Sequence, residues 1–63
     1  MIEEQYITVG TTFIGNVNNE EFTITKIEHS TDDTKVVCYN TKNGNYSLGY
    51  ETFRRLNARV KHR

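Results

Sequence analysis

Apolar and polar residues alternate near the start of the chain. In the stretch 7–16, Ile7, Val9 and then Phe13 stand among polar residues and glycine. This alternation is typical of a half-buried β-strand, because successive side chains of a strand point to opposite faces of the sheet. Gly10 breaks the pattern, so the sequence predicts a strand that is interrupted there.

A second stretch of alternation, 21–29, predicts a second strand. Phe22 and Ile24 follow a period of two, but Ile27 is out of phase with them. One extra residue in a strand moves the side chains that follow it to the other face of the sheet. We therefore expect a β-bulge or a strong bend near residues 25 and 26.

A β-hairpin is predicted in the second half of the chain. The stretch 35–42 is a candidate strand, and it is followed by Asn43-Gly44, a pair that favours tight hairpin turns because both residues tolerate positive φ. With this pair at the centre of the turn, the opposed residues are Lys42 and Asn45, Thr41 and Tyr46, Tyr39 and Leu48, and Val37 and Tyr50. Opposed residues share one face of a sheet. The more apolar face, which we predict to be the core face, is made of Val37, Tyr39, Tyr46, Leu48 and Tyr50.

The apolar spacing changes from that of a strand to that of a helix near the end of the chain. The residues that follow helical spacing are Tyr50, Phe53, Leu56 and Val60. A short amphipathic helix is therefore predicted near residues 50–56. Glu51 suits the positive end of the helix dipole, and its spacing from Arg55 favours an ion pair at i,i+4.

These elements predict a mainly β protein, an antiparallel barrel or a strongly bent sheet with one short C-terminal helix. Of the 63 residues, 35% are hydrophobic and 25% charged, which is the composition of a globular domain. A chain this short buries only about 60% of the surface that its unfolded form exposes. We expect an N-terminal arm at residues 1–8 and a single small β domain at residues 9–63.

Charge is distributed unevenly although the formal net charge is zero. Residues 1–33 contain every acid except Glu51 and only one base, Lys26, while residues 34–63 contain all the other bases. Such an asymmetry can mark a surface that binds a charged partner. It can equally hold the two halves of the molecule together, because neighbouring strands of opposite sign attract each other.

The residues required for common chemistries are sparse. One cysteine, Cys38, and two separated histidines, His29 and His62, do not supply the ligand spacing of a zinc site. Cys38 falls in the middle of a predicted strand, where a cysteine usually serves as a small apolar side chain. Phosphate-binding glycine motifs are absent from the sequence. We expect no catalytic residues, no metal and no cofactor, and hence a protein that is not an enzyme.

The candidate binding surface is basic and aromatic. Its residues are Tyr46, Tyr50, Arg54, Arg55, Arg59 and Lys61. Basic side chains neutralise phosphates and aromatic faces stack on bases, which favours a nucleic acid. The alternative is that the arginines are a solvated helix face paired with acids, and that the tyrosines belong to the core. A pI near 6.7 is lower than that of most nucleic-acid-binding domains.

The location of the protein is predicted from three further features. The first residues carry Glu3 and Glu4 where a secretory signal has a positive charge. The longest apolar run is Val36 to Tyr39, far shorter than the roughly 20 residues that span a bilayer. A single cysteine in so small a chain suggests a reducing compartment. We expect a cytoplasmic protein with no membrane partner.

The order of predicted elements resembles that of the small SH3-like barrels encoded by phages and bacterial mobile elements. The resemblance lies in the segments "VGTTF", "FTITKIE", "VVCYNTKNGNYSL" and "YETFRRL", while the closing strand of such a barrel is represented only by "ARVK". It implies a small binding module, either an adaptor or an inhibitor that binds another protein. The alternatives are a DNA- or RNA-binding regulator that uses the basic C-terminal face and a homo-oligomeric structural protein. A fold alone does not decide among them.

Overall fold

A computed structural model describes residues 1–62, and Arg63 lies outside the described part. The structure confirms a mainly β protein with one short α-helix. Five antiparallel strands form a single sheet, which is not closed. In chain order the elements are the 3-10 helix η1 (Glu4–Tyr6), β1 (Thr12–Gly15), β2 (Glu21–His29), β3 (Lys35–Thr41), β4 (Gly44–Gly49), α1 (Tyr50–Arg54) and β5 (Ala58–Val60).

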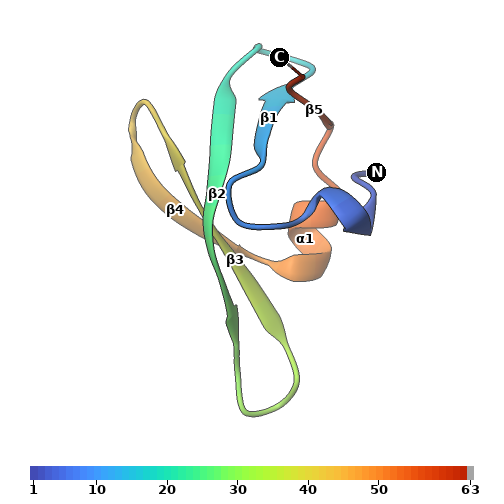
Figure 1. Cartoon of the computed structure of the whole chain (residues 1–63), viewed down its shortest axis with the longest axis vertical. Helices are drawn as coiled ribbons and strands as arrows, with labels where there is room; N and C mark the ends of the chain where they lie inside the picture. Colours follow the sequence, from blue (N-terminus) through green and yellow to red (C-terminus); the bar gives the residue numbers. More distant parts are fainter. Residues whose placement is uncertain (63) are drawn as a thin grey trace.

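The sheet has the strand order β4-β3-β2-β1-β5. The first four strands are connected in sequence, and α1 then takes the chain from one edge of the sheet to the other, where β5 pairs with β1. Figure 1 shows β4 and β5 on opposite sides of the molecule, with α1 next to the N-terminal segment. Both edges of the sheet are thus built from the C-terminal third of the chain.

The bend predicted in the second strand is confirmed. The register of β2 against β3 shifts between Ile24 and Lys26, so that one extra residue of β2 is left between two pairs. Ile24 is buried and Ile27 is partly buried, and both pack on the same hydrophobic core. The shift explains how two isoleucines that are out of phase in sequence reach one face of the sheet.

The hairpin forms where it was predicted, but the predicted register was wrong by two residues. Thr41 pairs with Gly44, so Lys42 and Asn43 occupy the turn, and Tyr39 faces Tyr46 in place of Leu48. Gly44 has a φ of 134°. Its positive φ is therefore needed at the first residue of β4 and not at the centre of the turn. Because side chains alternate with a period of two, a shift of two residues leaves every one on its predicted face.

The predicted helix is correct at its start and too long at its end. α1 ends at Arg54, and Val60, which was assigned to the helix face, belongs to β5, where it lies opposite Phe13. Glu51 pairs with Arg54 at 3.3 Å, and not with Arg55 as predicted. The spacing of Leu56 and Val60 fits a helix, but pairing with the open edge of β1 satisfies the backbone of this segment instead.

The core lies between α1, the N-terminal segment and one face of the sheet. Its fully or nearly buried side chains are Ile2, Ile7, Phe13, Ile24, Val37 and Phe53. Ile2 and Ile7 come from the segment that was expected to be an arm, and the backbone N–H of Ile2 donates to the carbonyl oxygen of Arg54 at 2.8 Å. Val9 was expected on a half-buried strand, but it is exposed and lies outside β1. The first eight residues therefore pack onto the domain.

Candidate functional site

Three aromatic side chains form a row across neighbouring strands, and the row emerges at the edge of the sheet. Phe22 on β2 lies 5.5 Å from Tyr39 on β3, and Tyr39 lies 5.9 Å from Tyr46 on β4, measured between ring centroids. At its inner end this aromatic row contacts the buried rings of Phe13 and Phe53. Tyr46 at the outer end is 48% exposed. The row is thus anchored in the core and presents one ring to solvent.

A shallow hollow of about 250 Å³ lies along the aromatic row. Its lining residues are Glu20, Phe22, Tyr39, Thr41, Asn43 and Tyr46. The rings of Tyr39 and Tyr46 are stacked at an interplanar angle of 29°, so Tyr46 is supported from behind. Burial raises the pKa of the Tyr39 hydroxyl, and the neighbouring Tyr46 adds to the rise. Tyr39 therefore stays neutral well above physiological pH. Glu20 is the only acidic residue among those that line the hollow, and the other side chains include three aromatic rings.

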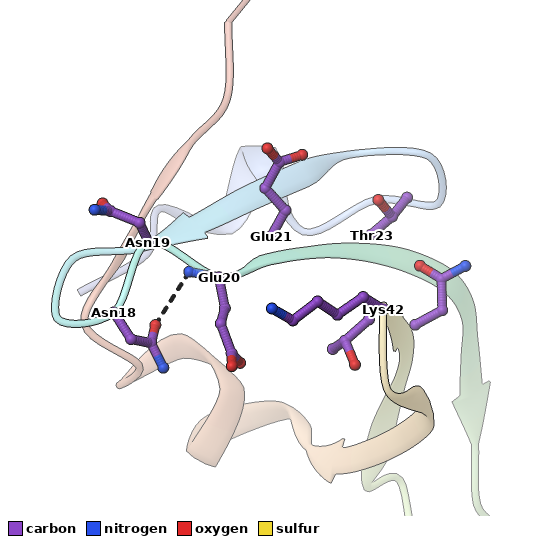
Figure 2. A pocket seen from close by; sticks show the side chains of 8 residues that line it. Asn18, Asn19, Glu20, Glu21, Thr23 and Lys42 are labelled. Carbon is purple, nitrogen blue, oxygen red and sulfur yellow. Dashed lines mark hydrogen bonds between the residues drawn. The ribbon is translucent and has the colours of Figure 1, made fainter.

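Glu20 lies between this aromatic hollow and a second, more polar hollow shown in Figure 2. The turn that precedes β2 fixes the backbone of Glu20, because the N–H of Glu20 donates a hydrogen bond to Asn18 Oδ1 at 3.1 Å. Within residues 1–62, the carboxylate of Glu20 has no hydrogen bond or ion pair. Lys42 extends toward Glu20 from the hairpin (Figure 2), but the two do not reach ion-pair distance.

β4 provides an open sheet edge beside the aromatic row. Its sequence, GNYSLG, contains neither a charged residue nor proline, the two features that commonly protect an edge strand from pairing with another chain. In the part of the chain that the structure describes, β4 pairs only with β3. The side of β4 that faces away from β3 is therefore available to another strand.

The backbone groups that face outward on β4 follow from the register of the hairpin. Thr41 and Gly44 flank a two-residue turn, and the pair that closes such a turn is hydrogen-bonded. Hydrogen-bonded and non-hydrogen-bonded pairs alternate along an antiparallel ladder. Asn45, Ser47 and Gly49 consequently direct their backbone N–H and C=O groups away from β3.

The residues of the basic and aromatic surface expected from the sequence are not gathered in one place. Tyr46 lies on β4 at one edge of the sheet, whereas Arg59 lies on β5 at the other, with Lys61 directly after that strand. Tyr50 and Arg54 lie at the two ends of α1. The expected surface is thus distributed over both edges of the sheet and the helix between them.

Several of these side chains interact with other residues of the same chain. The Nζ of Lys61 lies 2.9 Å from Glu21, and an Nη of Arg59 donates to the Asn16 side-chain oxygen at 2.6 Å. The Nε of Arg54 is buried without a partner among the described residues. The interactions of Lys61 and Arg59 both connect the C-terminal half of the sequence with the N-terminal half, and the one with Glu21 is an ion pair. Arg55 is exposed.

The ring of Tyr50 is occupied by a cation of the same chain. The Nζ of Lys35 lies 4.9 Å from the centre of the ring, a cation–π contact. Burial raises the pKa of the Tyr50 hydroxyl, and the carboxylate of Glu4 raises it further. Tyr50 therefore packs against its own chain, whereas Tyr46 offers a free face to solvent.

Other polar groups have structural explanations. In residues 1–62, no three histidine, cysteine, aspartate or glutamate side chains are grouped as metal ligands would be. The Sγ of Cys38 on β3 lies 3.8 Å from a carboxylate oxygen of Glu28 on the neighbouring strand β2. Hydrogen bonds from Ser30 and Thr34 lower the pKa of Asp32 to about 2. These bonds close the loop between β2 and β3 on itself.

Comparison with protein-family models, curated proteins and solved structures finds no match for this chain. None of the helices formed by residues 1–62 is long and apolar enough to cross a membrane.

Sequence reasoning identified Tyr46 but not the side chains that make a site around it. The sequence pattern predicts Tyr39 on the core face together with Tyr46, and for Phe22 it predicts only a place on a strand. The correct hairpin register would have placed Tyr39 opposite Tyr46, and the pairing of β2 with β3 then adds Phe22. The asparagine-rich stretch 16–19 indicates a turn before β2, but it does not indicate that this turn brings Glu20 to the aromatic row.

Proposed function

We propose that this protein is a small, non-catalytic module that binds an extended segment of another protein along the open edge of β4. The observation that supports this proposal best is the uncharged, proline-free edge strand with Tyr46 exposed upon it. An extended segment that adds to a sheet edge gains affinity from backbone hydrogen bonds, and its side chains supply specificity. Asn45, Ser47 and Gly49 would provide the backbone groups.

The nucleic-acid alternative has less support. The basic side chains lie at two sheet edges and on α1, and the Lys61 ammonium is paired with Glu21. A nucleic-acid surface requires several cations close together on one face, because affinity depends on the number of phosphates neutralised. We include in the proposal a cytoplasmic location and, from the resemblance to SH3-like barrels, a gene of phage or mobile-element origin.

The proposal is tested with peptides selected from a random-peptide library on the wild-type protein. We expect selected peptides to protect the amides of Asn45, Ser47 and Gly49 from hydrogen exchange, measured by NMR. Ser47→Pro removes one outward N–H and keeps the pairing with β3, so it should weaken peptide binding about tenfold, which corresponds to one lost hydrogen bond. Ser47→Ala is the matched control, because it removes the hydroxyl and keeps the amide.

Two results would overturn the proposal. One is peptide binding that is equally tight in Ser47→Pro, or that protects amides elsewhere in the molecule. The other is self-association: if sedimentation shows a dimer that Ser47→Pro dissociates, the edge serves a second copy of this chain, and the homo-oligomeric alternative replaces the adaptor.

A further inference from the structure

We propose that the aromatic hollow beside Tyr46 binds an arginine side chain carried by the partner's extended segment. This inference rests on the proposed function and specifies the chemistry of the partner. It combines three observations: an exposed aromatic ring, Tyr46, stacked on Tyr39 at the outer end of the aromatic row, the acidic residue Glu20 in the lining of the hollow, and the position of the hollow beside the open edge of β4.

The exposed ring supplies a stacking surface. A guanidinium group is planar and weakly hydrated, and it stacks on aromatic faces as well as attracting them as a cation. Tyr46 is held by Tyr39 behind it, and Tyr39 in turn contacts Phe22 and the buried Phe53. A ring supported in this way loses little freedom when a ligand covers it, so less of the stacking energy is offset by ordering.

The carboxylate supplies the opposite charge. Glu20 lines the hollow together with Tyr46, and in the described part of the chain its carboxylate has no partner. A carboxylate and a guanidinium match in geometry and form two parallel hydrogen bonds, which an ammonium cannot do. A purely apolar ligand in the hollow would exclude water from this carboxylate without offering it a hydrogen bond or an opposite charge. The exposed ring and the carboxylate together therefore favour arginine.

The position of the hollow matches the proposed strand pairing. Tyr46 lies between Asn45 and Ser47, two of the residues whose backbone groups face outward. Side chains of a strand added to β4 would alternate between the two faces of the sheet. Those on the face of Tyr46 would lie next to its ring and within reach of the hollow, while the backbone pairs with β4.

The smallest probe of this site is N-acetyl-arginine amide, titrated into labelled protein and followed by NMR. We expect millimolar binding that shifts the signals of Tyr46, Tyr39 and Glu20. N-acetyl-citrulline amide has nearly the same shape without the charge, and N-acetyl-lysine amide has the charge without the plane. Both should bind at least several-fold more weakly. Equal binding of citrulline, equal binding of lysine, or shifts confined to other residues would overturn the inference.

Variants test the two partners of the arginine separately. Tyr46→Leu and Glu20→Gln should each weaken binding of the arginine probe about threefold or more, the size expected of one exposed cation–π contact or ion pair. Glu21→Gln is the matched control, since it makes the same charge change at the neighbouring residue, which pairs with Lys61. Lys42→Gln removes the ammonium that points toward Glu20 (Figure 2) and should strengthen binding. Wild-type affinity in both Tyr46→Leu and Glu20→Gln would refute the site.

Ser47→Pro distinguishes this inference from the proposed function. The variant lacks an edge amide but retains the hollow, so it should bind the arginine probe like the wild type while losing the selected peptides. If peptides pair with β4 and the arginine probe does not bind, the arginine site fails and the edge function stands. If the probe binds and no peptide pairs with β4, the edge function fails, and the partner segment must reach the hollow in another way.

Discussion

Gly44 matters for the conformation of the backbone and not for contacts with other residues. Its φ of 134° lies in a region that residues with a side chain rarely adopt. A Cβ at this position would meet no atom within 4 Å. The requirement for glycine is therefore conformational and involves no close packing.

Gly44→Ala should lower the free energy of unfolding by ~1 kcal/mol, because alanine strains the backbone there. Chemical denaturation measures the change. Gly49→Ala is the control: Gly49 has a φ of −59° and equally open surroundings. We expect that variant to stay within ~0.5 kcal/mol of the wild type. A neutral Gly44→Ala would contradict the observed register of the hairpin.

At the scale of elements, the N-terminal segment is a structural part of the domain. Ile2 and Ile7 are 4% and 5% exposed and belong to the same core as Phe13 and Phe53. The N–H of Ile2 also satisfies the carbonyl of Arg54, one of the groups left without a partner at the end of a helix. The segment thus covers α1 and completes the side of the core that the sheet leaves open.

Ile2→Ala should destabilise the protein by ~2 kcal/mol or more, the usual loss for a buried isoleucine. Val9→Ala removes apolar atoms just after this segment, at a side chain that is 62% exposed. It should change the free energy of unfolding by less than ~0.5 kcal/mol. Thermal or urea unfolding compares the two. Equal small effects would show that the segment behaves as an arm and not as part of the core.

At the scale of the whole molecule, opposite charges of the two halves form a single ion pair among residues 1–62. Lys61 pairs with Glu21, and Arg59 donates to the uncharged Asn16, on the side of the sheet where β5 forms the edge. The Lys61–Glu21 pair is about half exposed. Exposed ion pairs contribute little to stability, so the charge asymmetry is not what holds the fold together.

We expect the triple alanine variant of Arg54, Arg55 and Arg59 to unfold thermally almost like the wild type. Each ion pair that it loses, such as that of Arg54 with Glu51, contributes ~1 kcal/mol or less to the free energy of unfolding. The protein-binding proposal also predicts that peptide binding at β4 survives this change, whereas a nucleic-acid surface would lose affinity and depend less steeply on salt. Unfolding of the variant would mean that the arginines are structural, above all Arg54, whose Nε is buried.

The local pattern of the sequence was sufficient for β2, β3, β4 and the start of α1, but not for η1, β5 or the start of β1. Alternation and the hairpin signal predicted these strands, the out-of-phase Ile27 predicted the bulge, and the change of period after Gly49 predicted the start of α1. These features depend on the side-chain periods of strand and helix, which neighbouring residues alone express. For the same reason the predicted face of the hairpin survived a register error of two residues.

Only the tertiary structure decided which segments meet. The pairing of β5 with β1, the burial of Ile2 and the approach of Glu20 to the aromatic row join residues that are far apart in the chain. The spacing of Leu56 and Val60 is compatible with a longer helix. The segment Ala58–Val60 forms β5 instead, because the open edge of β1 offers backbone partners to it. Local periodicity predicts which way a side chain points, but the choice of its neighbours depends on which backbone groups and apolar surfaces remain to be covered once the other elements have packed.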